Sequence, residues 1–309
     1  MPRSARSARP PFTSILCPVD FSEHSGAALR YGLAVAARFK AKATAVFVND
    51  PLLVAAAATA LTPLALERTS LTELRAFVDR ERKGVPGAPT VSCDVTQGDP
   101  AAEIERAVKR RKADLIVVGT HGLSGTRKLV FGSTTARVLR EARVPVLAVP
   151  ATLGGKIADW PGERVVAAVD LGPHTASDVQ AAARMADAFD AYLIIVHVMK
   201  PLHAPGWLTA RTVANDESRL TAARAALEEI AKTLDPSLEA VSRVVVGKPG
   251  EEIPSVAATT RSGLILVTLR EETGWLGTPQ GSITYDTLCH ATTPVLALPG
   301  RASKSSPGK

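Results

Sequence analysis

Short runs of apolar residues alternate along the chain with longer segments in which apolar residues recur every three or four positions. In the first half, the short runs predict strands near residues 15–19, 44–48, 91–95, 114–118 and 145–149. The longer segments predict helices over about 23–40, 67–83, 100–112 and 132–142. Strands that alternate with helices are typical of βαβ units, which build a parallel sheet covered on both faces. The pattern therefore predicts an α/β fold.

The second half of the chain repeats the first. "SILCPVDFSEHSGAALRYG" from residue 14 parallels "RVVAAVDLGPHTASDVQAA" from residue 164, and "VPVLAVP" from residue 144 parallels "TPVLALP" from residue 293. The offset is 150 residues at Asp20 and Asp170 and 149 at the later matches. So long a period indicates two tandem domains rather than a solenoid. We expect domains at 13–150 and 164–299, a linker at 151–163, and disordered basic tails at 1–12 and 300–309.

Five strands per domain favour a doubly wound sheet of the flavodoxin-like order 3-2-1-4-5, in which ligands bind where the chain leaves strands one and four towards opposite faces. Strand one ends at Asp20 and strand four at Gly119. "GTHGLSGTRKLVFGST", residues 119–134, then places four glycines between that strand and the next helix. Glycine permits close backbone approach, and a helix start offers free amides and a positive dipole end. The sequence therefore predicts a phosphate at this crevice.

The glycine spacing resembles that of the universal stress protein family. The nucleotide-binding branch of that family carries G-x2-G-x9-G-[ST], which is matched here by Gly119, Gly122, Gly132 and Ser133. The resemblance covers both predicted domains, and the pattern is not a Walker A loop. It implies a stress-response or regulatory protein with an ATP site in its first domain, with or without Mg²⁺.

By position, the resemblance implies that Asp20 contacts the ribose or adenine with Pro18 beside it, and that Val48 contacts adenine through its backbone. The residues implied to hold the ribose and phosphates are Gly119, Gly122, Gly132, Ser133 and Thr134. Structural alternatives stay open. Asp20 could instead hydrogen-bond the turn into the next helix, and Ser133 and Thr134 could be ordinary N-caps.

The second copy departs from this pattern. Thr268 and Glu271 stand where the first copy has its first two glycines, whereas Gly281 is retained. Side chains therefore occupy positions where a backbone would approach a phosphate, and the added acid repels one. We expect the second domain to be a degenerate, structural copy and the chain to bind one ATP.

The formal net charge of +7 does not indicate a nucleic-acid partner, because six of the bases lie in the two tails, which hold no acid. The three cysteines are far apart in the sequence, which suits reduced thiols in the cytoplasm better than disulfides. The longest uncharged stretch, residues 51–66, contains Pro63 and is too short and broken to span a bilayer, so no membrane partner is expected.

Three classes of function stay open at this point. The first is the ATP-binding regulatory protein, and the second is a structural pseudo-dimer that binds no nucleotide and acts through protein partners. The third is an enzyme such as an adenylating ligase, but the sequence shows no catalytic constellation and allows at most a slow ATPase. Because strand five is an apolar edge, we also expect the domains to pair through residues 145–149 and 294–298, with a further homodimer as an extension.

Overall fold

The computed structural model describes residues 10–58, 62–120, 132–150, 153, 157, 160–202, 209–269 and 283–300. The strands of the first half are β1 (Ser14–Val19), β2 (Lys42–Asn49), β3 (Val91–Gln97), β4 (Leu115–Gly119) and β5 (Val146–Val149). Those of the second half are β6 (Arg164–Ala168), β7 (Tyr192–Met199), β8 (Ala240–Val246), β9 (Leu264–Leu269) and β10 (Val295–Pro299). The helices are α1 (Glu23–Phe39), α2 (Pro51–Ala57), α3 (Pro63–Arg82), α4 (Pro100–Arg111), α5 (Ser133–Glu141), α6 (Thr175–Ala188), α7 (Thr209–Ala231), α8 (Pro249–Thr259) and α9 (Ile283–His290).

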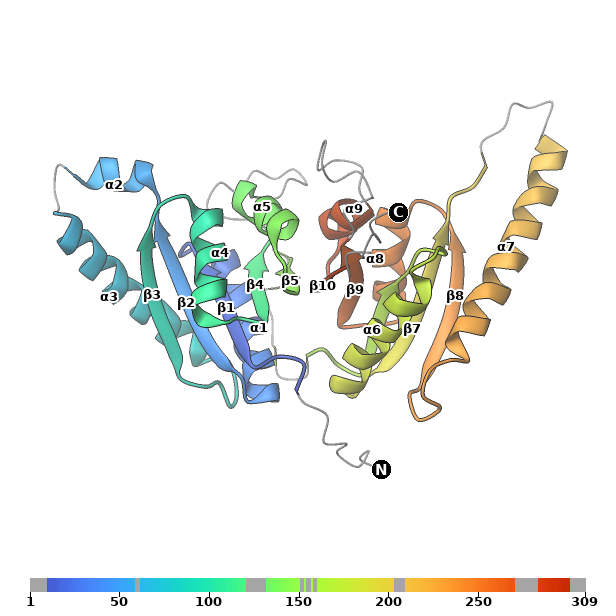
Figure 1. Ribbon diagram of the computed structural model, residues 1–309, viewed down its shortest axis with the longest axis horizontal. Helices are drawn as coiled ribbons and strands as arrows, with labels where there is room; N and C mark the ends of the chain where they lie inside the picture. The colour runs from blue at the N-terminus through green and yellow to red at the C-terminus, as the bar shows by residue number, and fades with distance from the viewer. Residues whose placement is uncertain are drawn as a thin grey trace, which may run out of the picture.

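The described strands form one sheet that runs across the whole molecule (Figure 1). Their order is β3-β2-β1-β4-β5-β10-β9-β6-β7-β8. Within each half, neighbouring strands are parallel and follow the order 3-2-1-4-5. The predicted α/β class and strand order are therefore confirmed.

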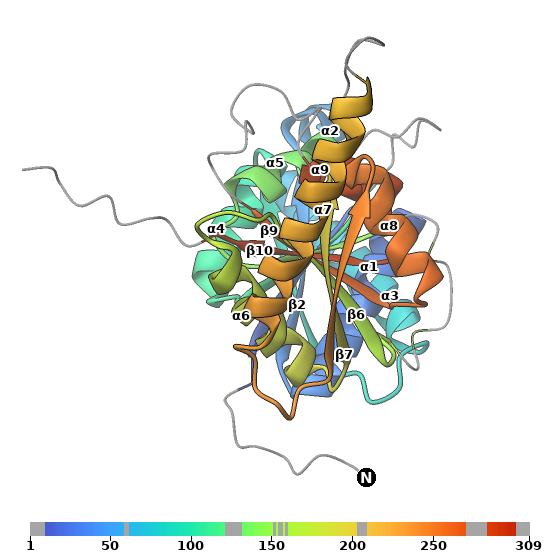
Figure 2. The same ribbon diagram turned by 90° about the vertical axis from the view of Figure 1, so that its right-hand side faces the viewer.

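Helices cover both faces of the sheet, as the view from the β8 end shows (Figure 2). One apolar cluster contains side chains of α1, α3, α6 and α7, and a second contains side chains of α4, α5, α8 and α9. Successive residues of a strand contribute alternately to the two clusters, as Leu193 and Ile194 do in β7. No helix in the described part of the chain is long and apolar enough to cross a bilayer.

The segment after β2 differs from the sequence-based expectation. Residues 51–57 form α2, which the hydrophobic pattern did not predict, and α3 begins at Pro63, four residues before its expected start. Thr62 caps α3, because its hydroxyl accepts a hydrogen bond from the backbone N–H of Ala65 at 3.2 Å. Pro63 at the first helical position starts the helix rather than breaking it, since its missing N–H would have no partner there.

The two halves of the sheet meet where β5 and β10 pair antiparallel. Leu147 lies opposite Leu296, flanked by the pairs Ala148–Val295 and Val146–Ala297. All six side chains are at most 1% exposed. A strand that is buried on both faces needs a continuous apolar run, and "VLAV" and "VLALP" supply it.

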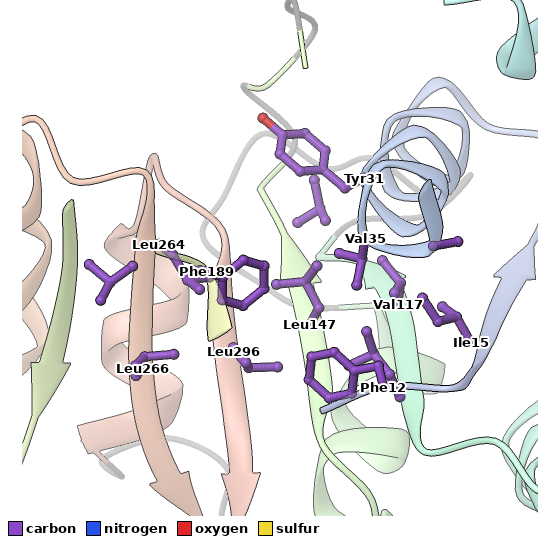
Figure 3. Close-up of a cluster of buried hydrophobic side chains, with 14 of the residues drawn as sticks. Phe12, Ile15, Tyr31, Val35, Val117, Leu147, Phe189, Leu264, Leu266 and Leu296 are labelled. Atoms are coloured by element: carbon purple, nitrogen blue, oxygen red, sulfur yellow. The ribbon is translucent and has the colours of Figure 1, made fainter. Parts of the chain in front are cut away.

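Aromatic rings from both halves surround this junction on one face of the sheet. Phe39 of α1 lies 5.9 Å from Phe12 and 5.2 Å from Phe189, measured between ring centroids. Trp160 then packs edge-on against Phe189 at 5.7 Å and against Tyr31 of α1 at 5.2 Å. The cluster around Leu147, Leu296 and Phe189 is drawn in Figure 3. The rings therefore connect the first half, the segment before β6 and the second half.

Trp160 is held in place by a second contact. Its indole N–H donates to the carbonyl of Gly263 at 2.7 Å, and the next residue, Pro161, passes so close to Gly263 that a Cβ there would overlap its carbonyl. In the first half the matching position is Asp114, whose carboxylate accepts from the backbone N–H groups of Thr13 and Ser14. The two copies therefore use the start of strand four differently.

Replacing Trp160 tests the importance of the rings. We expect Trp160→Ala to lower the free energy of unfolding by about 3 kcal/mol, because ring contacts to both halves and one hydrogen bond are lost. Trp160→Phe, which retains a ring, should lose less than half of that. Urea titrations followed by far-UV circular dichroism measure both, and an unchanged midpoint for the alanine variant would contradict the interpretation.

Candidate functional site

A cavity of about 690 Å³ opens at the carboxyl ends of β1, β2 and β4. Its walls come from the turn after β1, the end of β2, one side of α3, and the first residues of α4 and α5. The predicted site residues that line it are Pro18, Asp20, Val48, Gly119, Gly132, Ser133 and Thr134. Gly122, the remaining predicted residue, lies outside the described residues. Segments far apart in the sequence thus meet where the doubly wound order places a ligand.

Asp20 fixes the turn between β1 and α1. Its Oδ1 atom accepts from the backbone N–H of Ser22 at 3.1 Å and from the Ser22 hydroxyl at 2.5 Å. The Ser22 hydroxyl oxygen in turn accepts from the N–H of Ser25 and caps α1. The structural role considered for Asp20 is therefore present, and the same carboxylate also lines the cavity.

The start of α5 presents backbone amides to the cavity. Gly132 is its N-cap, and no side chain among the described residues caps this helix end. Ser133 and Thr134 are already helical, so the alternative that either is the N-cap is wrong. Uncapped amides with the positive end of the helix dipole stabilise an anion.

Thr135 is a positioning residue that sequence analysis missed. Its hydroxyl donates to the carbonyl of Gly119 at 2.9 Å, which ties the first turn of α5 to the end of β4. The side chain is 9% exposed. In the sequence, Thr135 is the second threonine of "GSTT" and directly follows the predicted site residues. Its partner lies sixteen positions earlier, and a hydrogen bond over that distance leaves no local sequence pattern.

Phe21 was also missed, although it follows Asp20 directly. Its φ of 63° is uncommon for a residue with a large side chain. Two rings hold it there: Phe47 at 4.6 Å and Phe77 at 5.6 Å between centroids. Both Phe21 and Phe47 line the cavity, so this strained backbone lies at the candidate site.

The wall formed by α3 has no signal in the local sequence. Ser70 of α3 donates its hydroxyl to the Asn49 side-chain oxygen at 3.0 Å, and both residues are buried. This bond anchors α3 over the end of β2 and brings Thr69 and Glu73 to the cavity. Because α3 and β2 approach one another only in the folded chain, their order along the sequence does not predict the wall.

Charges divide the cavity into two parts. Asp20, Asp50 and Glu73 line the side formed by β1, β2 and α3, and the described lining residues include no base. The start of α5 is the part that favours an anion. No group of three His, Cys, Asp or Glu side chains among the described residues could hold a metal ion.

The corresponding cavity of the second domain is nearly filled, with a volume of about 50 Å³. Asp170 and Thr268 line it, in the places of Asp20 and Gly119. A Cβ on Gly250 would overlap the side chain of Asp286, so α9 packs directly against α8. The first domain has Ala101 where the second has Gly250. The loss of one methyl group thus accompanies the closer packing of the helices and the smaller cavity.

The fold and the cavity define a duplicated, doubly wound α/β protein with a ligand-sized hollow in its first copy. The family model of the universal stress protein family matches residues 11–150 and 162–299. The chain therefore belongs to the universal stress protein family, in a tandem arrangement. The resemblance inferred from the sequence is confirmed at the level of the family.

Individual relatives agree with this assignment. A universal stress protein of Methanocaldococcus jannaschii is 30% identical over 139 residues, which is 45% of this chain and 82% of the relative. The crystal structure of a universal stress protein from Archaeoglobus fulgidus matches with a TM-score of 0.65 and 19% identity, covering 94% of this chain and 97% of that one. A protein of unknown function from Pseudomonas aeruginosa matches with a TM-score of 0.60 and 18% identity, covering 93% and 92%. These two structures support the fold alone.

Removing the Thr135 hydroxyl tests its positioning role. We expect Thr135→Val to lower the free energy of unfolding by about 1–2 kcal/mol, because the partly buried Gly119 carbonyl loses its donor. Thr135→Ser keeps the hydroxyl and should be close to the parent protein. Chemical denaturation compares the three, and equal losses for valine and serine would assign the effect to packing instead.

Burial of Cys17 generates a second prediction. Desolvation raises the pKa of the Cys17 thiol from 9.0 to about 12. In the folded protein this thiol therefore stays protonated in the pH range above 9, in which an exposed thiol ionises. We therefore expect Cys17 to resist iodoacetamide at pH 8 until the chain unfolds.

The raised pKa also means that the contribution of this thiol to the free energy of unfolding is complete below pH 9 and falls between pH 9 and about 12. Peptide mapping after alkylation measures the protection of Cys17. Labelling of native Cys17 as fast as in a denatured control would contradict this prediction.

Proposed function

We propose that this universal stress protein binds one ATP per chain, in the domain formed by residues 13–150, and that the domain at 164–299 is a structural copy joined through the linker at 151–163. The observation that carries this proposal is the difference between the two matching cavities, about 690 Å³ in the first domain and about 50 Å³ in the second. The larger volume falls within the range of small-molecule sites, roughly 300–1,000 Å³.

The placement of the ligand follows from the charges of the cavity. The phosphates lie at the start of α5, where Gly132, Ser133 and Thr134 offer backbone amides and hydroxyls. The base and ribose lie between the ends of β1 and β2, where Asp20 accepts hydrogen bonds from the ligand and Val48 contacts the base. This orientation keeps the phosphates away from the Asp50 and Glu73 carboxylates.

Nucleotide occupancy serves regulation in this proposal. Bound ATP turns over slowly at most in this proposal, because the described lining residues include no lysine or arginine to stabilise the charge that develops on a transferred phosphate. Mg²⁺ enters with the phosphates rather than in a protein cage. The reduced cysteines fit a cytoplasmic location, and a homodimer is an extension of the proposal.

Calorimetric titration of the full chain with ATP, with and without Mg²⁺, tests the stoichiometry. We expect one ATP per chain, because only the first domain combines the open cavity with the glycine set. Two ATP molecules per chain would contradict the assignment of the second domain. Absence of any binding signal would favour the alternative function, a structural pseudo-dimer that acts through protein partners.

A charge at the glycine motif provides the sharper test. Gly122→Glu places in the first domain the residue that the second carries at Glu271, and we expect at least a hundredfold loss of ATP affinity with unchanged circular dichroism. Gly172→Glu is a matched control, because Gly172 lies in the turn after β6 and an added Cβ meets nothing within 4 Å. The control should bind ATP like the parent protein. Equal affinities in both variants would show that the phosphates lie elsewhere.

A further inference from the structure

The second domain has a groove at the amino-terminal ends of its strands. This groove, of about 980 Å³, lies at the ends of β6, β7 and β8. The proposed nucleotide cavity, in contrast, lies at the carboxyl ends of the first-domain strands. The floor of the groove is the sheet face that α8 covers further along, where Tyr192 and Val241 are half-buried and Ile194 is 2% exposed. Ile194 and Val241 are direct neighbours on β7 and β8.

In the first domain, ion pairs occupy the same place. Arg111 at the end of α4 binds the Asp94 carboxylate of β3 through its Nε at 2.7 Å and through a second guanidinium nitrogen. Arg110 adds a longer contact of 3.6 Å to the same carboxylate. These long side chains bridge the end of the helix and the edge strand.

The second domain has exchanged each member of this cluster. Arg243 stands at the position of Asp94, and Thr259 and Thr260 stand at those of Arg110 and Arg111. The two threonine hydroxyls donate to carbonyls of their own helix, at 3.0 Å to Ser255 and 2.7 Å to Val256. Neither threonine side chain therefore bridges to β8 as the arginines do in the first domain, and the groove stays open.

Three arginines line the groove, and none of them has a carboxylate partner among the residues that the structure describes. Arg164, Arg243 and Arg261 form no ion pair with any residue that the structure describes. Arg164 donates only a long hydrogen bond, 3.4 Å, to the Thr260 carbonyl. Arg243 lies beside Val196, two residues deeper along the strands than the pair Ile194–Val241. A guanidinium presents two parallel N–H groups that match a carboxylate or phosphate.

Acidic residues restrict the kind of anion that fits. Glu163, Asp190 and Glu239 also line the groove, and each lies just before the start of a strand, at its outer rim. They balance the three arginines, so a polyanion such as nucleic acid gains little attraction. A small ligand can place one anionic group at the arginines and keep the rest of its surface on the apolar floor.

We propose that this groove binds a small organic anion with an aromatic or aliphatic body. Arg243 holds its carboxylate or phosphate group, Arg164 and Arg261 flank it, and its body lies on Tyr192 and Val241. The site is independent of the ATP site, which lies in the other domain at the other end of the strands.

Naphthyl phosphate, which combines one phosphate with a flat apolar ring, is a suitable probe. Titrated into the full chain in the presence of saturating ATP, it should bind with a stoichiometry of one and raise the midpoint of thermal unfolding. In Arg243→Asp combined with Thr260→Arg, which copies the ion pair of the first domain, we expect at least a tenfold loss of affinity for the probe. Arg224→Asp is the matched control, because Arg224 is exposed on α7 and does not line the groove. It should bind the probe like the parent protein.

The outcomes separate this proposal from the one on ATP. Equal probe affinity in the parent, the double variant and the control would overturn the groove as the site, as would the absence of binding at millimolar probe. Complete displacement of the probe by ATP would place it in the first domain and would also overturn the proposal. Loss of ATP binding in Gly122→Glu with unchanged probe binding would support two separate sites.

Discussion

An apolar strand at the edge of a sheet exposes unpaired backbone groups, and in this protein β5 and β10 satisfy one another. Both strands become central strands of one sheet, buried on both faces, which explains why each is apolar at every position. The rings of Phe12, Phe39, Phe189 and Trp160 can form one cluster only because this pairing brings their elements together. The orientation of each cavity relative to the other domain follows from the same contact.

The two domains have similar sheets, but the cavities at the ends of their strands differ. In the first domain, α4 carries Ala101 at the position of Gly250, and the cavity at the carboxyl ends of the strands is open. In the second, Gly250 lets α9 approach α8 and that cavity is nearly filled. The amino ends of the strands also differ, since Arg110 and Arg111 pair with Asp94 in the first domain whereas Arg243 lines an open groove in the second.

The candidate ATP site relies on backbone groups more than on charged side chains. Its anion-binding element is the uncapped start of α5, fixed to β4 by the Thr135 hydroxyl. The carboxylates of Asp20, Asp50 and Glu73 occupy the other side of the cavity. Such an arrangement stabilises an anion through backbone N–H groups and the helix dipole rather than through a charged side chain.

The sequence by itself determined the α/β class, the tandem repeat and the family. The spacing of apolar residues predicts strands and helices from short segments, and the repeat follows from direct comparison of the two halves of the sequence. It also predicted that Asp20, Gly119 and Gly132 lie close together, since parallel strands bring their carboxyl ends to one edge, and all three line one cavity. Only the tertiary structure decided which helix wall encloses the cavity, that Thr135 fixes α5, and that Ser133 is not an N-cap. The sequence likewise did not predict the open groove beside Arg243. Each of these features depends on side chains that are distant along the chain and meet only when helices pack on the sheet.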